Sequence, residues 1–218
     1  MPALPERILV YHEAMMNFDD KAKTWDSDPV KEERTLAVAI ALRQRVPLAH
    51  DWHALEYGCG TGQLSFALQA DLGRVTLADS SPGMLAVLQE KIIAAELSHL
   101  HPLALDLMTD PPPAERYDLI YTLMTLHHVT DTHRLLKVFH DLLRPGGWLG
   151  IADLDQEDGS FHGPGFTGHM GFDRDALRSQ LADAGFARVD FSTCFLMKKA
   201  TDQGVREYPL FLAVATRP

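Results

Sequence analysis

The stretch Glu56-Tyr57-Gly58-Cys59-Gly60-Thr61-Gly62 carries three glycines at alternate positions. It follows a short apolar segment, residues 53–57, that is typical of a buried strand, and helical spacing of apolar residues resumes at Leu64. Because glycine has no Cβ, such a turn lets the backbone bend tightly and approach a ligand closely. The stretch therefore predicts a strand, a glycine turn and a helix beside a nucleotide-like ligand.

The same strand–helix unit recurs along the chain. Residues 74–78 form a second predicted strand that ends at Asp79, and Ser81-Pro82 then begin a helix with a capping hydroxyl followed by proline. This alternation predicts an α/β fold, a mostly parallel sheet with helices on both faces. Further strands are expected at 101–105, 117–121, 148–152, 187–195 and 208–216, the last two as an antiparallel hairpin, and further helices at 28–45, 131–143 and 173–184.

Length, composition and charge exclude several classes of protein. With 218 residues, 46% of them apolar, one compact domain is expected. No apolar stretch approaches the roughly 20 residues that span a bilayer, and the first residues, 1–7, lack the pattern of a signal peptide. Only Cys59 and Cys194 are present, which favours a reducing cytoplasm. A formal charge of −10 disfavours nucleic acid as a partner.

A carboxylate at the end of the second strand strengthens the ligand hypothesis. Asp79 lies 21 residues after Gly58 (79 − 58), close to the roughly 20 expected of a group that binds a ribose diol. The dinucleotide fingerprint needs a glycine at position 63, where this chain has Gln63, so a nicotinamide or flavin cofactor is disfavoured. The alternative is that the glycine turn is only a tight connection between a strand and a helix.

Over nearly its whole length the chain resembles the class I S-adenosylmethionine-dependent methyltransferases. That resemblance implies a three-layer, doubly wound sheet of seven strands in the order 3-2-1-4-5-7-6. The segments that carry it are Leu55-Glu56-Tyr57-Gly58-Cys59-Gly60-Thr61-Gly62, Asp79-Ser80-Ser81-Pro82-Gly83-Met84, Leu105-Asp106-Leu107, Leu126-His127-His128 and Leu142-Leu143-Arg144-Pro145-Gly146-Gly147.

The resemblance also implies which residues bind the cofactor S-adenosylmethionine, with S-adenosylhomocysteine as the product. Carboxylates suit the ammonium, diol and amine donors of this cationic ligand. The expected contacts are Glu56 and the backbone of Gly58, Cys59 and Gly60 to the methionine part, Asp79 to the ribose, Ser80 and Met84 to the adenine ring, Asp106 with Leu107 to the adenine amine, and Thr122 after the fourth strand.

Residues 18–26 resemble the N-terminal lid of the same family. Trp25 is expected to cover the cofactor and attract its sulfonium, with simple packing of the indole as the alternative. His127 and His128 follow the fourth strand where the family places the methyl group, so either is a candidate general base, with loop packing or helix capping as the alternative.

A glycine-rich and apolar loop, residues 159–171, is expected to cover the acceptor. Its candidate acceptor-binding residues are His162, Phe166 and His169, and its composition indicates an apolar or aromatic small molecule. The histidines have no spacing typical of a ligand set on one helix, so no metal is predicted.

The sequence therefore predicts methyl transfer to an O, N, S or C atom of a small molecule. The alternative is a regulatory or scaffold protein that binds the same cofactor without transferring methyl groups. The expected organisation is a single domain, monomeric or homodimeric, with a helical lid at 1–48, a cofactor-binding half at 49–153 and an acceptor loop with the C-terminal hairpin at 154–218. The motif typical of amide methylation in proteins and nucleic acids is absent after the fourth strand.

Overall fold

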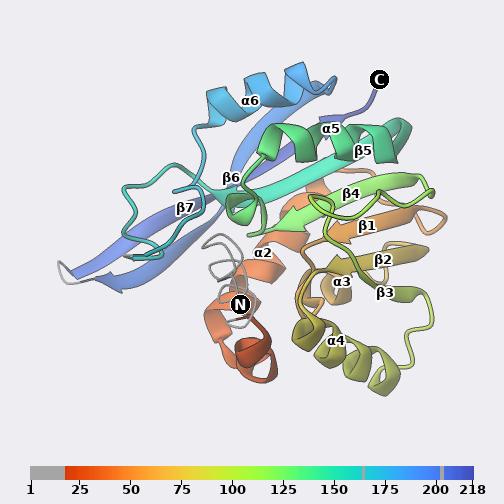
Figure 1. The fold of residues 1–218 in the computed structure, drawn as a ribbon, viewed down its shortest axis with the longest axis horizontal. Coiled ribbons are helices and arrows are strands. Elements are labelled where there is room, and N and C mark those ends of the chain that lie inside the picture. Colours follow the sequence, from red (N-terminus) through yellow and green to blue (C-terminus); the bar gives the residue numbers. More distant parts are fainter. Residues whose placement is uncertain (1–17, 164, 202–203) are drawn as a thin grey trace, which may run out of the picture.

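The computed structural model describes residues 18–163, 165–201 and 204–218. Its centre is a seven-stranded sheet in the order β3-β2-β1-β4-β5-β7-β6, which confirms the predicted fold class (Figure 1). The described elements are η1 (Ala22–Ser27), α2 (Pro29–Arg45), β1 (His53–Tyr57), α3 (Gln63–Leu68), β2 (Arg74–Asp79), α4 (Pro82–Ala94), β3 (Leu100–Ala104), β4 (Tyr117–Leu123), η2 (Leu126–His128), α5 (Thr132–Leu142), β5 (Leu143–Leu154), α6 (Arg174–Asp183), β6 (Ala187–Thr201) and β7 (Gly204–Thr216).

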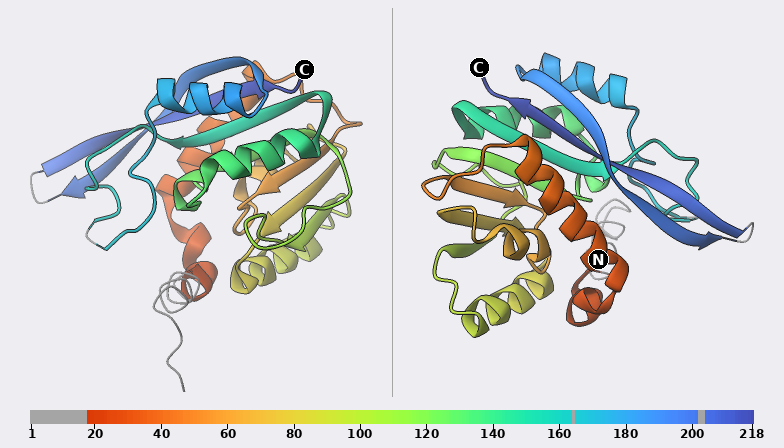
Figure 2. Two further views of the ribbon diagram at one scale, coloured as in Figure 1. Left: turned by 45° about the horizontal axis from the view of Figure 1, so that its top comes forward. Right: turned by 180° about the vertical axis from the view of Figure 1, so that it is seen from behind.

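Helices cover both faces of the sheet, which gives the predicted three layers. Strands β1 to β5 run parallel, and β7 pairs antiparallel with both β5 and β6. One apolar core lies between the sheet and α2, α3 and α4, and a second lies between the sheet and α5 and α6. In the two turned views α2 crosses the face opposite to α5 (Figure 2). The alternation of side chains along each strand supplies both cores.

Helix α2 begins where the capping pattern predicts. The Asp28 carboxylate accepts a hydrogen bond from the Val30 amide, and Pro29 is the first helical residue. Its buried face includes Val38, Ala39 and Leu42. The apolar residues Leu36 and Ile40 recur at helical spacing and would be expected on the buried face, but they are about half exposed, at 50% and 53%. Spacing alone therefore identified the helix without identifying its buried side.

The C-terminal hairpin is longer than the sequence indicates. The pairing of β6 with β7 continues to Thr201 and Gly204, beyond the expected ends at 195 and 208. The extra length projects past the rest of the sheet, as the blue strands show (Figure 1). Strand β5 also begins earlier, at Leu143, because its ladder with β4 continues across a register shift around the predicted turn.

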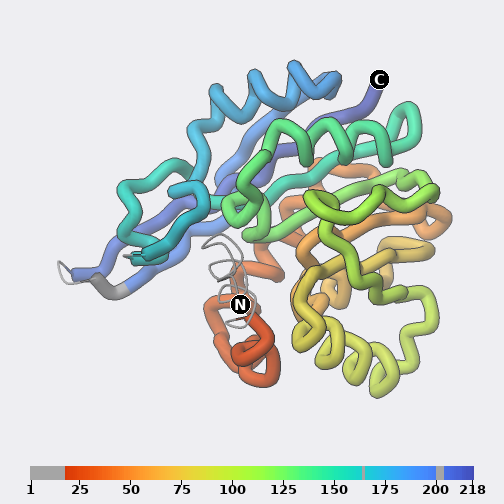
Figure 3. The backbone as a smooth tube through the Cα atoms, viewed as in Figure 1, coloured from red at the N-terminus to blue at the C-terminus, as the bar shows by residue number. Residues whose placement is uncertain are grey.

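The N-terminal segment lies beside the carboxyl ends of the strands. Residues 18–21 are helical and continue into η1, which contacts α4. The smooth trace shows this red segment next to the olive α4 (Figure 3). The predicted lid, 1–48, is described only from residue 18, so the segment 1–7 considered for export lies outside the described residues, as does residue 164 of the acceptor loop. None of the described helices is both long and apolar enough to cross a bilayer.

Glycine 62 provides a test of how tightly the turn after β1 is packed. A Cβ on Gly62, whose φ is +79°, would lie 2.6 Å from Cδ1 of Leu88, whereas a Cβ on Gly146, with φ +80°, would meet nothing within 4 Å. Both Gly→Ala variants incur the left-handed backbone penalty, but only the first also incurs a steric clash. We expect Gly62→Ala to lower the free energy of unfolding by about 3 kcal/mol and Gly146→Ala by about 1 kcal/mol. Urea unfolding measures both, and equal losses would contradict the packing described.

Candidate functional site

The glycine turn after β1 has the conformation that the sequence predicts. Gly58, Gly60 and Gly62 all adopt positive φ angles, of +69°, +53° and +79°. A Cβ on Gly58 would lie 2.2 Å from Cγ2 of Thr125, so this position has no room for a side chain. The turn is therefore closed against the protein at Gly58 and Gly62.

Gly60 differs from Gly58 and Gly62 because a Cβ there would meet no steric clash. A Cβ placed there would lie 3.9 Å from both Sδ of Met84 and Nε1 of Trp25, with no nearer heavy atom outside the turn itself. The turn, the start of α4 and the N-terminal segment thus border one cradle. The structure brings together three residues that the sequence analysis assigned to the cofactor.

Asp79 at the end of β2 holds this cradle together. Its carboxylate accepts hydrogen bonds from the Gly60 amide at 2.7 Å and from the Ser81 amide at 2.9 Å. Burial raises the pKa of Asp79, although the backbone donors oppose that effect. The carboxylate therefore fixes the loops that follow β1 and β2 while standing at the cradle. Ser80, between Asp79 and Ser81, is exposed.

Glu56 is a buried carboxyl group at the end of β1. Its carboxylate accepts hydrogen bonds from the amide and the hydroxyl of Ser65, and the same hydroxyl lies 2.6 Å from the hydroxyl of Tyr121. The residue is only 2% exposed, and this burial raises the pKa of Glu56 to about 8. Glu56 thus joins β1, α3 and β4, and it carries a proton at neutral pH.

The expected adenine-binding end is held by a tyrosine that the sequence analysis did not select. The Tyr57 hydroxyl donates to Asp106 at 3.3 Å and accepts from the Leu107 amide at 3.2 Å. Asp106 also accepts from the Met108 amide at 2.9 Å. Leu107 is buried. The backbone donor of Leu107 is therefore already paired within the protein.

The other predicted cofactor residues occupy buried positions close to the turn. Cys59 is buried, which raises the pKa of its thiol well above the ordinary value, so it is not a reactive thiolate. Thr122, on β4, is also buried, and its hydroxyl has no hydrogen-bond partner among the residues that the structure describes.

Two aspartates attach the N-terminal segment to the cradle. Asp19 accepts hydrogen bonds from the Gly83 amide at 2.8 Å and from the Ser81 hydroxyl at the start of α4. Asp26 accepts from the Thr61 hydroxyl at 2.5 Å and pairs with Lys91 at 2.6 Å. Sequence reasoning missed both roles, because their partners are 35 to 65 residues away along the chain.

Trp25, in the lid, lies beside the glycine turn at Gly60. The ammonium group of Lys31 stands 3.6 Å from the centre of its ring, so one face of the indole is occupied by a cation. Phe18 packs against Trp25 with a centroid distance of 6.0 Å and against His128 at 5.3 Å. The lid therefore reaches from the glycine turn to the histidines.

His127 is fixed by a buried carboxylate. Its Nδ1 lies 2.6 Å from Oδ1 of Asp153, and its amide donates to Oδ2 of the same residue at 3.2 Å. Both residues are almost completely buried, at 1% and 0% exposure. Arg34 is buried and interacts electrostatically with Asp153, and burial lowers the pKa of Arg34 to about 10. Nε2 of His127 is buried without a partner within the described part of the chain.

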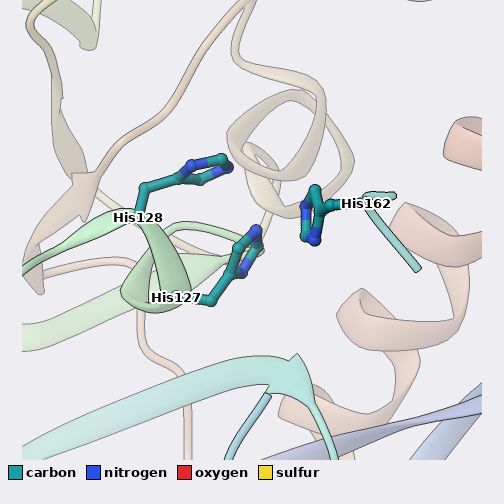
Figure 4. Close-up of side chains that lie close together, drawn as sticks. All are labelled: His127, His128 and His162. Carbon is teal, nitrogen blue, oxygen red and sulfur yellow. The ribbon is translucent and has the colours of Figure 1, made fainter. Parts of the chain in front are cut away.

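The ring of His127 lies close to the rings of His128 and His162 (Figure 4). Nitrogens of His127, His128 and His162 all lie within 4.8 Å of one another. His128 is exposed at the rim, yet the protein packed around the ring and the neighbouring histidines lower its pKa to about 3. Burial, assisted by His127, lowers the pKa of His162 to about 4. His128 and His162 are therefore neutral at physiological pH.

The acceptor loop reaches the histidines through two different contacts. His162 stacks on Phe166 with a centroid distance of 3.8 Å and an interplanar angle of 11°. His169 instead anchors the loop, because its amide donates to the His127 carbonyl at 2.7 Å and its ring lies 3.0 Å from the Val129 carbonyl. Two of the three predicted acceptor residues thus face the cluster with their rings.

Comparison with known proteins agrees with this arrangement. A family model described as a methyltransferase domain matches residues 55–149, which contain the glycine turn, Asp79, Asp106 and His127. This part of the chain is therefore similar to methyltransferase domains. The match begins inside β1 and ends inside β5, so the lid and the acceptor loop lie outside it.

Individual relatives are moderately similar. A ubiquinone biosynthesis O-methyltransferase of Marinobacter nauticus is 29% identical over 151 residues, covering 66% of this chain and 63% of that protein. The matched part covers between 48% and 63% of the length of such curated relatives.

Solved structures share the fold. A Haloferax volcanii protein in complex with the Trm112 methyltransferase activator has a TM-score of 0.73 and 20% identity over 92% of this chain and 97% of that one. A Haemonchus contortus phosphoethanolamine N-methyltransferase in complex with S-adenosyl-L-methionine has a TM-score of 0.67 and 15% identity over 83% of this chain and 52% of that one.

Glu56 predicts a specific pH dependence of stability. The folded protein keeps the Glu56 proton up to a pKa of about 8, whereas the ordinary pKa of a glutamate is 4.5. The free energy of unfolding of wild type therefore falls as the pH rises between these values, because folding then requires a proton on Glu56. Glu56→Gln has no such proton to bind. Between pH 5 and pH 8 the free energy of unfolding of wild type should therefore fall by about 3 kcal/mol relative to that of the variant.

Urea unfolding across this range measures the effect. The matched control is Glu90→Gln, which changes an exposed glutamate on α4 and should run parallel to wild type at every pH. Parallel curves for Glu56→Gln as well would contradict the buried, protonated carboxyl.

Proposed function

We propose that the protein transfers a methyl group from S-adenosylmethionine to a small-molecule acceptor. The observation that carries this proposal is the cradle at Gly60, where the glycine turn, Asp79, Met84 and Trp25 lie together and a Cβ on Gly60 would meet no clash. The match of residues 55–149 to a methyltransferase domain and the likeness to a fold neighbour solved with this cofactor support the same ligand.

The residues around the cradle fit such a ligand chemically. The cofactor is cationic, and the cradle presents carboxylates and aromatic faces in a chain with a formal charge of −10. In the proposal Asp79 accepts from the ribose diol, and the backbone of Gly58, Cys59 and Gly60 contacts the methionine part. Met84 and Ser80 line the adenine ring, and adenine recognition rests on the carboxylate of Asp106.

In this proposal Glu56 positions the glycine turn and α3 as well as lying near the methionine part of the cofactor. Its carboxyl is paired with Ser65 inside the protein, so it orders the helix that follows the glycine turn. A cation bound beside it favours its ionised form. Thr122 and Trp25 complete the proposed contacts, from β4 and from the lid.

S-adenosylmethionine supplies an electrophilic methyl group for in-line displacement. The chain itself must then orient the acceptor and exclude water, since positioning supplies much of the rate in such reactions. The lid, fastened by Asp19 and Asp26, covers one side of the cradle. The acceptor loop covers the other, and His127 with His128 stands between them as the proposed catalytic pair.

The acceptor is proposed to be an apolar or aromatic small molecule. Phe161, His162 and Phe166 give the loop a row of ring contacts, and His169 acts as its anchor. The name of the Marinobacter nauticus relative, a ubiquinone biosynthesis O-methyltransferase, favours an oxygen acceptor on such a molecule.

Asp79 gives the most direct test of the cofactor. We expect wild type to bind S-adenosylhomocysteine and not NADH in titration calorimetry, and Asp79→Asn to lose about 100-fold or more in affinity, because charge-assisted hydrogen bonds contribute roughly 1.5–3 kcal/mol each. The control is Asp141→Ala, an exposed position on α5, with circular dichroism to confirm folding. Unchanged affinity in folded Asp79→Asn, or NADH binding by wild type, would contradict the proposal.

A further inference from the structure

The cluster of His127, His128 and His162 has the composition of a metal site. Each ring offers one nitrogen, and these nitrogens lie within 4.8 Å of one another. The ring centroids are 4.2 Å apart for His127 and His128 and 4.9 Å apart for His127 and His162. Figure 4 shows the three rings turned toward one shared space. The sequence analysis predicted no metal because it looked for ligands within a single helix.

A second observation comes from nitrogens that the protein leaves unpaired. Nε2 of His127 and Nδ1 of His162 are both buried and have no hydrogen-bond partner in the described ranges 18–163, 165–201 and 204–218. An unpaired buried polar atom costs roughly 1–3 kcal/mol, so such atoms are rare unless something binds them. Nε2 belongs to a side chain that is 99% buried, since His127 is 1% exposed.

Asp153 supplies the outer support that metal-binding histidines need. Its carboxylate accepts from Nδ1 of His127 at 2.6 Å, which leaves Nε2 as the nitrogen with a free lone pair. A ligating histidine generally donates its other ring N–H to such a carboxylate, which fixes the ring and increases its basicity. Leu154 and His127 amides hold the carboxylate in place.

We infer that these three histidines bind one divalent transition-metal ion of the zinc class, with Asp153 as the positioning residue. Imidazole nitrogens suit Zn²⁺, Co²⁺, Ni²⁺ and Fe²⁺, whereas Mg²⁺ prefers oxygen ligands. Zinc–nitrogen bonds of about 2.0–2.1 Å place tetrahedral ligands roughly 3.4 Å apart, so nitrogens that now lie up to 4.8 Å apart approach by up to about 1.4 Å on binding. His162 comes from a loop rather than from a helix or strand, so its ring is the one that we expect to move.

Three protein ligands leave one coordination position open, as in catalytic rather than structural zinc sites. The open position lies beside the acceptor loop, so an oxygen or sulfur atom of the acceptor is its ligand. Such an acceptor binds as its anion and releases its proton to solvent. This acceptor role rests on the proposed function, whereas metal binding itself does not.

Titration of tag-free, chelator-treated protein with Co²⁺ tests the site, because tetrahedral Co²⁺ absorbs visible light. We expect one Co²⁺ per chain, displaced by Zn²⁺ and not by Mg²⁺. His162→Ala and His128→Ala should each weaken binding about 100-fold, and Asp153→Asn by about 10–100-fold. His133→Ala, an exposed histidine on α5, is the matched control and should bind like wild type.

Two results would overturn the inference: no saturable binding of Co²⁺ or Zn²⁺ by wild type, or equal affinities in His162→Ala and His133→Ala. Because His162 lies in a loop, its variant avoids the folding defect that a change at buried His127 risks. Titration of the same samples with S-adenosylhomocysteine separates the two proposals. Cofactor binding without metal binding overturns the metal site alone, and metal binding without cofactor binding overturns the proposed function alone.

Discussion

The carboxylate of Asp79 joins the two loops that leave β1 and β2, and the arrangement of the cradle depends on that junction. One oxygen accepts from Gly60 and the other from Ser81, so neither loop moves without the other. Ser81 in turn donates its hydroxyl to Asp19 and accepts from the Met84 amide. A continuous set of hydrogen bonds thus runs from the glycine turn through the start of α4 to the lid. Since every member is at least partly buried, loss of one bond leaves a polar group without compensation.

A second carboxylate plays a comparable part at the end of β5. Asp153 is fully buried and fixes His127, as Asp79 fixes the glycine turn. The two sites face the same edge of the sheet, where parallel strands end and helices begin, which is the usual position of ligands in this class of fold. The residues proposed to bind the cofactor and those proposed to bind the acceptor therefore come from separate loops at the same edge of the sheet. The acceptor loop is attached at the same edge through the His127 carbonyl.

Sequence patterns predicted the helix starts and the glycine turn because each depends on local rules, whereas the sheet order and the cofactor residues came from the family resemblance. Capping at Asp28 and Ser81 and positive φ angles at the three glycines are decided within a few residues. The lid attachments of Asp19 and Asp26, and the histidine cluster, depend on contacts across 34 to 65 residues, which no local pattern encodes. The exposed Leu36 and Ile40 show the same limit, since helical spacing leaves the choice of buried face to tertiary packing.

A crystal structure of the protein with S-adenosylhomocysteine tests the central claim most directly. The account predicts the ligand beside Gly60, under Trp25, with its ribose hydroxyls on the Asp79 carboxylate and its sulfur directed toward His127 and His128. A ligand bound elsewhere on the chain, or a cradle still empty at saturating concentration, would contradict the account.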